Sequence, residues 1–206
     1  MEVIIKALVK AQIAQSIENL QKVLKDDSIH EAVVRAAQMT AEAMREGKLM
    51  VCGNGGSAAD SQHLVAEFVS RLTVDRPPLR AIALTTDTSI LTAIGNDYSY
   101  ENVFERQVEA LGRPGDVLLA ISTSGNSSNC IKALQLARKM GIHTVSYTGN
   151  SGGAMAELSG INIVIPSHRT ANIQEAHLVL EHIFCMVVER FYFGTDFGSQ
   201  PEHLAE

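Results

Sequence analysis

The stretch Val51-Cys-Gly-Asn-Gly-Gly-Ser57 decides how the surrounding chain folds. It ends the apolar run Lys48–Cys52 and leads into Ala58–Val69, where apolar residues recur at helical spacing. Its three glycines permit the positive φ angles and close backbone approach that a tight loop needs. The pattern therefore predicts a strand, a short loop and a helix, with Ser57 as the N-cap of that helix.

The predicted helix carries two features of a functional site. The free N–H groups of its first turn, together with the helix dipole, favour a bound anion. His63 and Glu67 lie four residues apart, so both side chains project from one face. The simpler alternatives are a turn without a ligand and a solvated surface pair, and the loop matches neither common nucleotide-binding fingerprint. An anion site and an imidazole–carboxylate pair on one helix together favour an active site.

Composition restricts the class of protein. A chain of 206 residues fits one domain that can bury a sizeable core. A net charge of −6 argues against a nucleic-acid-binding surface, which needs clustered Lys and Arg. The three cysteines, Cys52, Cys130 and Cys185, lack metal-type spacing and are typical of a reduced, cytosolic protein. No stretch reaches 18 apolar residues and the start lacks a signal-peptide pattern, so we expect a soluble cytoplasmic protein with no membrane partner.

The order of the elements predicts the fold. Helices are expected at about Ile4–Lys25, Ser28–Glu46, Ala58–Val69, Ser89–Ile94, Asn102–Leu111, 128–140, 153–158 and 171–192, and further strands at Arg80–Leu84, Asp116–Ile121, Ile142–Tyr147 and Ile161–Ile165. This alternation predicts an α/β fold with a doubly wound, five-stranded parallel sheet and an N-terminal helical extension. We expect residues 1–47 to pack on the domain or an oligomer, 48–193 to form the α/β domain, and 194–206 to be a loose tail.

A second loop, Ser122-Thr-Ser-Gly-Asn-Ser-Ser128, follows the strand predicted at Asp116–Ile121. Hydroxyl groups and the N–H groups of a helix N-terminus can hold a phosphate monoester without a lysine. The alternative is an exposed loop whose hydroxyls bond their own backbone and cap the helix. Because the loop joins a buried strand to a helix, we favour phosphate binding. In parallel sheets, ligands lie beyond the carboxyl ends of the strands, where both loops occur.

Taken together, the two loops resemble those of the sugar isomerase (SIS) domain family. Further matches are Ala93-Ile-Gly-Asn-Asp97, Arg113-Pro-Gly-Asp-Val117, and Ile173-Gln-Glu-Ala-His177 followed by His182. The similarity extends from the first helix to about Tyr192. Within the family, the chain most specifically resembles isomerases of seven-carbon sugar phosphates. It implies a flavodoxin-like sheet, a homotetramer with shared active sites, and conversion of sedoheptulose 7-phosphate to D-glycero-D-manno-heptose 7-phosphate for the ADP-heptose branch of lipopolysaccharide synthesis.

The resemblance also assigns roles to individual residues. It implies Glu67 as the catalytic base, His182 as its acid partner, and one zinc ion per subunit held by His63, Glu67, Gln174 and His182. The implied substrate contacts are Asn54, Gly55, Gly56, Ser57, Glu67, Asn96, Asp97, Ser122, Thr123, Ser124, Ser127 and Gln174. Among these, the amide and carboxylate of Asn96 and Asp97 would bind sugar hydroxyls, and the Ser122–Ser127 loop would bind the phosphate.

The chemistry fits the residue types independently. Aldose–ketose isomerisation moves a proton between C1 and C2 through an enediol, which needs a base at the carbon and an acid near O1 and O2. Glu67 and His182 are suitable groups, and a zinc ion on nitrogen and oxygen ligands would polarise the carbonyl. Gln174 and His182 lie eight residues apart, about 12 Å along a helix, so one ion between them is at the limit of reach.

Other readings remain open. A non-catalytic SIS tetramer that binds the replication initiator DnaA would resemble this chain throughout, but it would not need an acid–base pair such as Glu67 and His182. A sugar-phosphate-sensing regulator would carry a DNA-binding module that the sequence does not show. We expect His177 and Glu181 to form a surface pair on the last helix.

Overall fold

The computed structural model describes residues 1–194, 196 and 197, so most of the tail expected at 194–206 lies outside the described residues. Five parallel strands form one sheet: β1 (Leu49–Gly53), β2 (Ala81–Ala83), β3 (Val117–Ser122), β4 (His143–Gly149) and β5 (Ile161–Ile165). Their order is β2-β1-β3-β4-β5, which is the flavodoxin-like arrangement. The predicted doubly wound α/β fold is confirmed.

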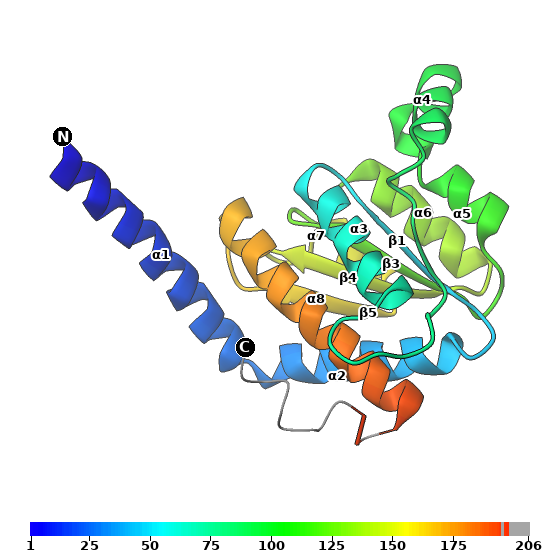
Figure 1. The fold of residues 1–206 in the computed structure, drawn as a ribbon. Coiled ribbons are helices and arrows are strands. Elements are labelled where there is room, and N and C mark those ends of the chain that lie inside the picture. Colours follow the sequence, from blue (N-terminus) through cyan, green and yellow to red (C-terminus); the bar gives the residue numbers. More distant parts are fainter. Residues whose placement is uncertain (195, 198–206) are drawn as a thin grey trace.

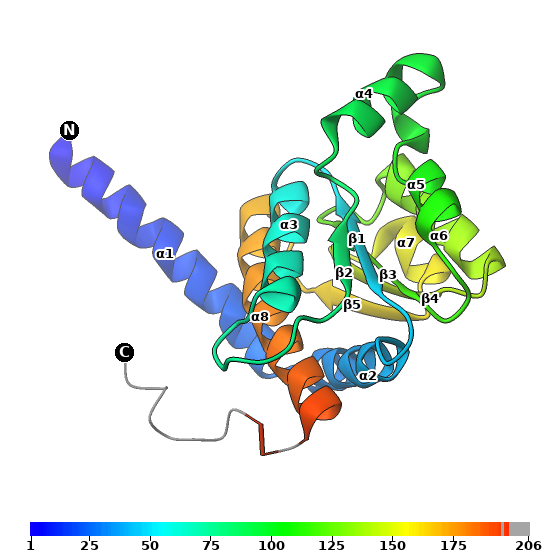
Figure 2. The same ribbon diagram turned by 45° about the vertical axis from the view of Figure 1, so that its right-hand side comes forward.

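The helices cover both faces of this sheet (Figures 1 and 2). They are α1 (Glu2–Leu24), α2 (Asp27–Ala43), α3 (Gly56–Val69), α4 (Thr88–Asp97), α5 (Glu105–Leu111), α6 (Ser128–Lys139), α7 (Gly153–Leu158) and α8 (Thr170–Phe193), with a short 3-10 helix at Tyr100–Asn102. Helices α2, α3 and α8 lie on one face, and α5, α6 and α7 lie on the other. Because each face is covered, every residue of β1 and β3 is buried, and apolar residues fill both strands up to Ser122 at the end of β3.

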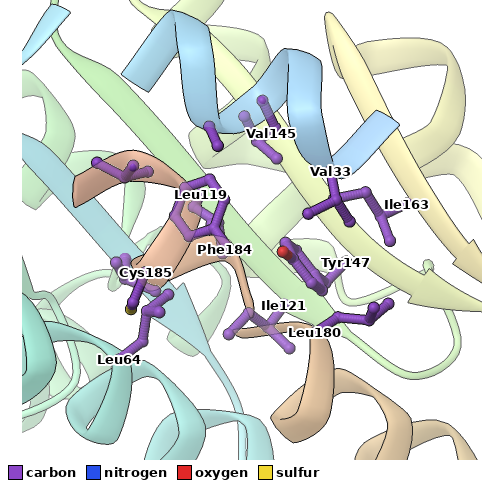
Figure 3. Packing of buried hydrophobic residues seen from close by; sticks show 14 of the residues in the cluster. Val33, Leu64, Leu119, Ile121, Val145, Tyr147, Ile163, Leu180, Phe184 and Cys185 are labelled. Atoms are coloured by element: carbon purple, nitrogen blue, oxygen red, sulfur yellow. The ribbon is translucent and has the colours of Figure 1, made fainter. Parts of the chain in front are cut away.

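Two hydrophobic cores follow from the alternation of side chains along the strands. Leu119 points toward α2 and α8 and joins a core with Tyr147 and Phe184 (Figure 3). Its neighbour Leu118 points to the opposite face and packs with Leu134 of α6. Helices α3 and α8 share the first core, so their positions relative to each other are set by buried packing.

Helix α1 projects away from the α/β domain (Figures 1 and 2). Its C-terminal half packs on the domain, where Val23 is buried and Asn19 Nδ2 donates to the carbonyl of Asn172 at 2.8 Å, and near its middle Gln12 Oε1 accepts from Arg169 at 2.8 Å. Toward the N-terminus its apolar side chains are exposed to solvent, with Ile13 55% and Ile17 52% exposed. In the described part of the chain, no helix is both long and apolar enough to cross a membrane.

Several helix boundaries differ from the prediction: α2 ends at Ala43 instead of Glu46, and α5 begins at Glu105 instead of Asn102. Helix α3 begins at Gly56 and its N-cap is Gly55, at φ 58°, so Ser57 lies in the first turn and is not the N-cap. A Cβ at Gly53 would lie only 2.6 Å from the Ser57 carbonyl oxygen, which shows how closely the loop folds back on the helix. Helix α4 continues through Gly95 to Asp97, because Gly95 does not adopt the positive φ of a C-terminal cap.

Candidate active site

The candidate site lies where the strand order reverses, between β1 and β3. The last residue of β1, Gly53, pairs in register with Ile121 of β3. The glycine loop after β1 and the serine loop after β3 therefore begin side by side at the carboxyl edge of the sheet. In doubly wound folds this switch point is the place where ligands bind.

Side chains bridge the two loops. Asn54 and Asn129 exchange two amide hydrogen bonds, each 2.8 Å long, from the glycine loop to the start of α6. The Tyr100 hydroxyl also donates to Asn54 Oδ1, at 3.1 Å. Of these three residues only Asn54 was predicted. The tyrosine and Asn129 reach it from remote parts of the sequence, so no local pattern pointed to them.

The serine loop gathers hydroxyl groups as predicted. Ser122 Oγ lies 2.9 Å from Ser127 Oγ and 3.3 Å from Ser124 Oγ. Ser127 is the N-cap residue of α6, but its side chain makes no capping hydrogen bond. The hydroxyls of Ser122 and Ser127 therefore face each other instead of capping the helix, whereas Ser124 Oγ accepts a hydrogen bond from the Asn126 backbone N–H at 3.2 Å, as the simpler reading expects.

The loop between β4 and α7, together with the start of α7, packs directly against the serine loop. Gly125 has φ 67°, and a Cβ there would lie 2.0 Å from the carbonyl oxygen of Gly152. The Gly125 carbonyl accepts a hydrogen bond from the Met155 N–H at 3.0 Å, and Asn126 Oδ1 accepts one from the Ala154 N–H at 3.0 Å. Such close backbone packing holds the hydroxyls in a defined arrangement.

A cluster of imidazole and carboxylate groups forms between α3 and α8. His63 Nε2 lies 2.8 Å from His182 Nε2 and 3.6 Å from Glu67 Oε1. One ligand atom from each residue lies within 4.8 Å of the others, and all three side chains are partly buried. Two imidazole nitrogens and a carboxylate oxygen are the donor set of a catalytic zinc site with an open position, so these residues fit the implied metal.

The other predicted residues make different contacts. Gln174 Nε2 donates to Asp60 Oδ2 at 3.2 Å, and the Thr123 carbonyl accepts from Asn150 at 3.3 Å. Asn96 and Asp97 are exposed at the end of α4, where the Asn96 amide donates to the Asp97 carboxylate at 2.8 Å. Among the described residues, no hydrogen bond joins either side chain to the two loops, so their predicted role in binding sugar stays a prediction.

Comparison with known proteins identifies the family. A family model described as the SIS domain matches residues 11–149. The chain belongs to the SIS domain family. It is 50% identical to the phosphoheptose isomerase of Clostridium acetobutylicum over 190 residues, which cover 92% of this chain and 97% of that one.

Solved structures of relatives agree with this family. The phosphoheptose isomerase of Neisseria gonorrhoeae is 44% identical, with a TM-score of 0.84 and coverage of 90% of this chain and 98% of that chain. The Francisella tularensis enzyme is 34% identical, with a TM-score of 0.85 and coverage of 89% and 97%. The SIS domain fold thus extends over nearly the whole described chain.

A second polar group of residues lies buried beneath the site, and here the sequence prediction was wrong. His177 and Glu181 are 0% and 1% exposed, so they are not a surface pair. His177 Nε2 donates to the Thr148 carbonyl at 3.0 Å, and burial lowers the pKa of its imidazole to about 4. Burial, and then the charge of Asp60, raises the pKa of the Glu181 carboxyl to about 8. Among the described residues, neither carboxyl oxygen of Glu181 has a hydrogen-bond partner. Periodicity alone did not reveal this, because α8 is covered on more than one face.

Proposed function

We propose that this SIS domain protein is a phosphoheptose isomerase that converts sedoheptulose 7-phosphate to the corresponding aldose phosphate. The observation that carries the proposal is the close approach of the Glu67, His63 and His182 side chains, whose ligand atoms lie within 4.8 Å of one another. The two histidines lie on different helices and are 119 residues apart in sequence. An enzyme of this type needs a base and an acid on the same substrate, whereas a scaffold protein does not. The relatives described above, which are named as phosphoheptose isomerases, support the same reaction.

In the proposed reaction the Glu67 carboxylate removes a proton from C1 of the ketose and an enediol forms. His182 donates a proton to O2 as the enediol forms and then takes the proton from O1, and the protonated Glu67 returns its proton to C2, which completes the aldose. The side chain of Glu67 is 16% exposed, so it can reach the substrate while most of it is shielded from water. His63 lies against both groups and orients them.

The donor set supports a bound zinc ion. His63, Glu67 and His182 would hold it, with the Gln174 oxygen as the predicted fourth ligand. When bound, zinc would supply a Lewis acid that polarises the substrate carbonyl. Asn54, Gly55, Gly56 and Ser57 would line the sugar, as the position of the glycine loop beside the serine loop suggests.

The reaction can be tested directly. Purified protein incubated with sedoheptulose 7-phosphate is expected to form the aldose phosphate, measured by chromatography against the known product. Sedoheptulose without its phosphate should react poorly, because the serine loop would be empty. No aldose from the phosphorylated sugar, in a folded and zinc-loaded sample, would contradict the proposal. The alternative, a tetramer that binds the DnaA initiator, finds no support among the relatives described above.

Replacing serine-loop hydroxyls should weaken phosphate binding. Ser124→Ala and Ser127→Ala are each expected to raise KM. The expected loss of binding free energy is roughly 1–2 kcal/mol for each variant, about the contribution of one hydrogen bond to a charged group. Because the phosphate is remote from the reacting carbons, kcat should change less. Ser159→Ala is a matched control, since its hydroxyl bonds the Met155 carbonyl at the end of α7, just before β5 begins. Steady-state kinetics of the three variants check this, and parental KM values in both loop variants would place the phosphate elsewhere.

We also propose that the chain assembles into a homotetramer. The exposed apolar side chains of α1 are the main support, because an isolated helix gains little from such residues in water. An apolar groove between α1, α2 and α8, lined by residues that include Val34, Val179 and Ile183, offers further surface for a second copy. A closed symmetric assembly would bury both surfaces.

Assembly is therefore expected to depend on the apolar face of α1. Ile13→Glu should shift the protein to smaller species in light scattering at micromolar concentration, because a charge in a buried interface is costly. Gln15→Glu places the same charge on the same helix at a polar, exposed position and should leave the mass unchanged. A parent protein that is monomeric at these concentrations would refute the assembly.

A further inference from the structure

The side-chain amide of Gln174 is held in a fixed place between two parts of α3. A Cβ at Gly56 would lie 2.0 Å from Gln174 Nε2 and 2.6 Å from Oε1, so the amide packs directly on the Gly56 backbone. One turn further along α3, Asp60 Oδ2 accepts the 3.2 Å hydrogen bond from Nε2. Only glycine at position 56 leaves room for this arrangement.

Asp60 decides which end of that amide is available. An amide carries a donor and an acceptor of similar size, and the two can be exchanged by a half-turn of the group. A carboxylate only accepts, so Asp60 selects the orientation in which the NH2 group faces it. Gln174 Oε1 is then the end that remains free to accept a hydrogen bond or to bind a cation.

We propose that Asp60 is a positioning residue that fixes the amide of Gln174, so that its oxygen and not its nitrogen is offered to the substrate and metal site. This inference rests on the proposed isomerase function and on the role of Gln174 in it. Asp60 is 8% exposed and lies three residues before His63 on α3. It does not itself need to touch the sugar, because its effect passes through Gln174.

The burial of Asp60 supports a dedicated role. Desolvation raises the pKa of its carboxyl, while the hydrogen bond from Gln174 lowers it. Nearby Glu181 is also buried, and the Asp60 charge adds to the desolvation that raises the pKa of the Glu181 carboxyl to about 8, so Glu181 does not favour the ionised form of Asp60. A carboxyl kept at such a position is better explained by the amide that it orients than by a contribution to stability.

A double-mutant cycle tests the proposal. Asp60→Ala and Gln174→Ala are each expected to lower kcat/KM about tenfold, the effect of losing one hydrogen bond to a charged group. Because Asp60 acts through Gln174, the double variant should be no worse than Gln174→Ala alone. Asp60→Asn retains an acceptor oxygen of the same reach, so it should recover part of the loss. Independent, multiplying losses in the double variant would overturn the inference.

Two further measurements separate positioning from a structural role. If Gln174→Ala changes kcat, Asp60→Ala should also change kcat, and the same correspondence should hold for KM. The zinc dissociation constant, measured by chelator competition, should shift equally in both variants. Asp116→Ala is the structural control: Asp116 is buried immediately before β3 and accepts from the Lys48 and Arg113 backbone N–H groups, so its loss should lower thermal stability without changing kcat.

The outcomes distinguish this inference from the proposed function. Parental kinetics in Asp60→Ala together with impaired Gln174→Ala would overturn the positioning role alone. Parental kinetics in Gln174→Ala would remove that residue from the proposed site and the positioning role with it. A protein that shows no isomerase activity at all would refute the proposed function before any variant is made.

Discussion

Glu67→Gln is expected to lower kcat by a factor of at least about 100, the lower range for a positioned general base. Glutamine has nearly the same shape as glutamate but cannot accept the substrate proton at neutral pH. The side chain lies on the partly exposed face of α3, where Glu67 Oε1 is 3.6 Å from His63 Nε2. The variant should therefore fold, assemble and bind sugar phosphate as the parent does.

The decisive measurement is exchange of the substrate C1 hydrogen with deuterated water, followed by NMR. If Glu67 is the base, exchange should slow in step with turnover. Exchange at the parental rate would show that another group removes the proton, and the role would pass to His182. Glu42→Gln is a suitable control, because Glu42 is exposed near the end of α2 and its carboxylate accepts only from Gln38 among the hydrogen bonds described.

Metal content should respond in the same variant. Loss of one ligand is expected to weaken zinc binding, so Glu67→Gln and His63→Ala should both retain less zinc after dialysis than the parent. Retention of full zinc content in both variants would argue against the cluster as the metal site. Elemental analysis provides the measurement without reference to activity.

The second large effect is expected on stability, from a buried ion pair that the sequence did not reveal. Arg76 Nε donates to Glu189 Oε1 at 2.6 Å, and the two side chains are 1% and 3% exposed. The same guanidinium donates to the carbonyls of Glu67 at 2.8 Å and Phe68 at 2.9 Å. Arg76 thus fastens the end of α3, which carries Glu67, to the C-terminal half of α8.

Glu189→Ala is expected to destabilise the fold by about 3–5 kcal/mol, because it leaves the Arg76 charge buried without its partner. The midpoint of urea denaturation should fall accordingly at a fixed protein concentration, since assembly also affects apparent stability. Glu18→Gln removes a carboxylate from the exposed Lys22–Glu18 pair on α1 and should leave the midpoint nearly unchanged. Equal midpoints for Glu189→Ala and the parent would show that water solvates Arg76 and that the pair does not fasten the helices.

The sequence alone was sufficient for the order of elements, the sheet and the two loops. Apolar runs mark strands buried on both faces, and the glycines after Cys52 and within Ser122–Ser128 mark tight connections, because these signals act through nearest neighbours along the chain. The pair His63 and Glu67 was also visible, since helical spacing alone puts both on one face. Even the flavodoxin-like strand order followed from the family resemblance.

Tertiary structure decided the contacts between segments. The pairing of Asn54 with Asn129, of Gln174 with Asp60, and of Arg76 with Glu189 joins residues at least 75 positions apart. Such contacts depend on how α3, α6 and α8 are rotated on the sheet, and rotation is set by core packing that no local pattern encodes. The same packing buried His177 and Glu181, which periodicity had placed at the surface. The sequence thus determined which residues could act, and the packing of helices on the sheet decided which of them meet.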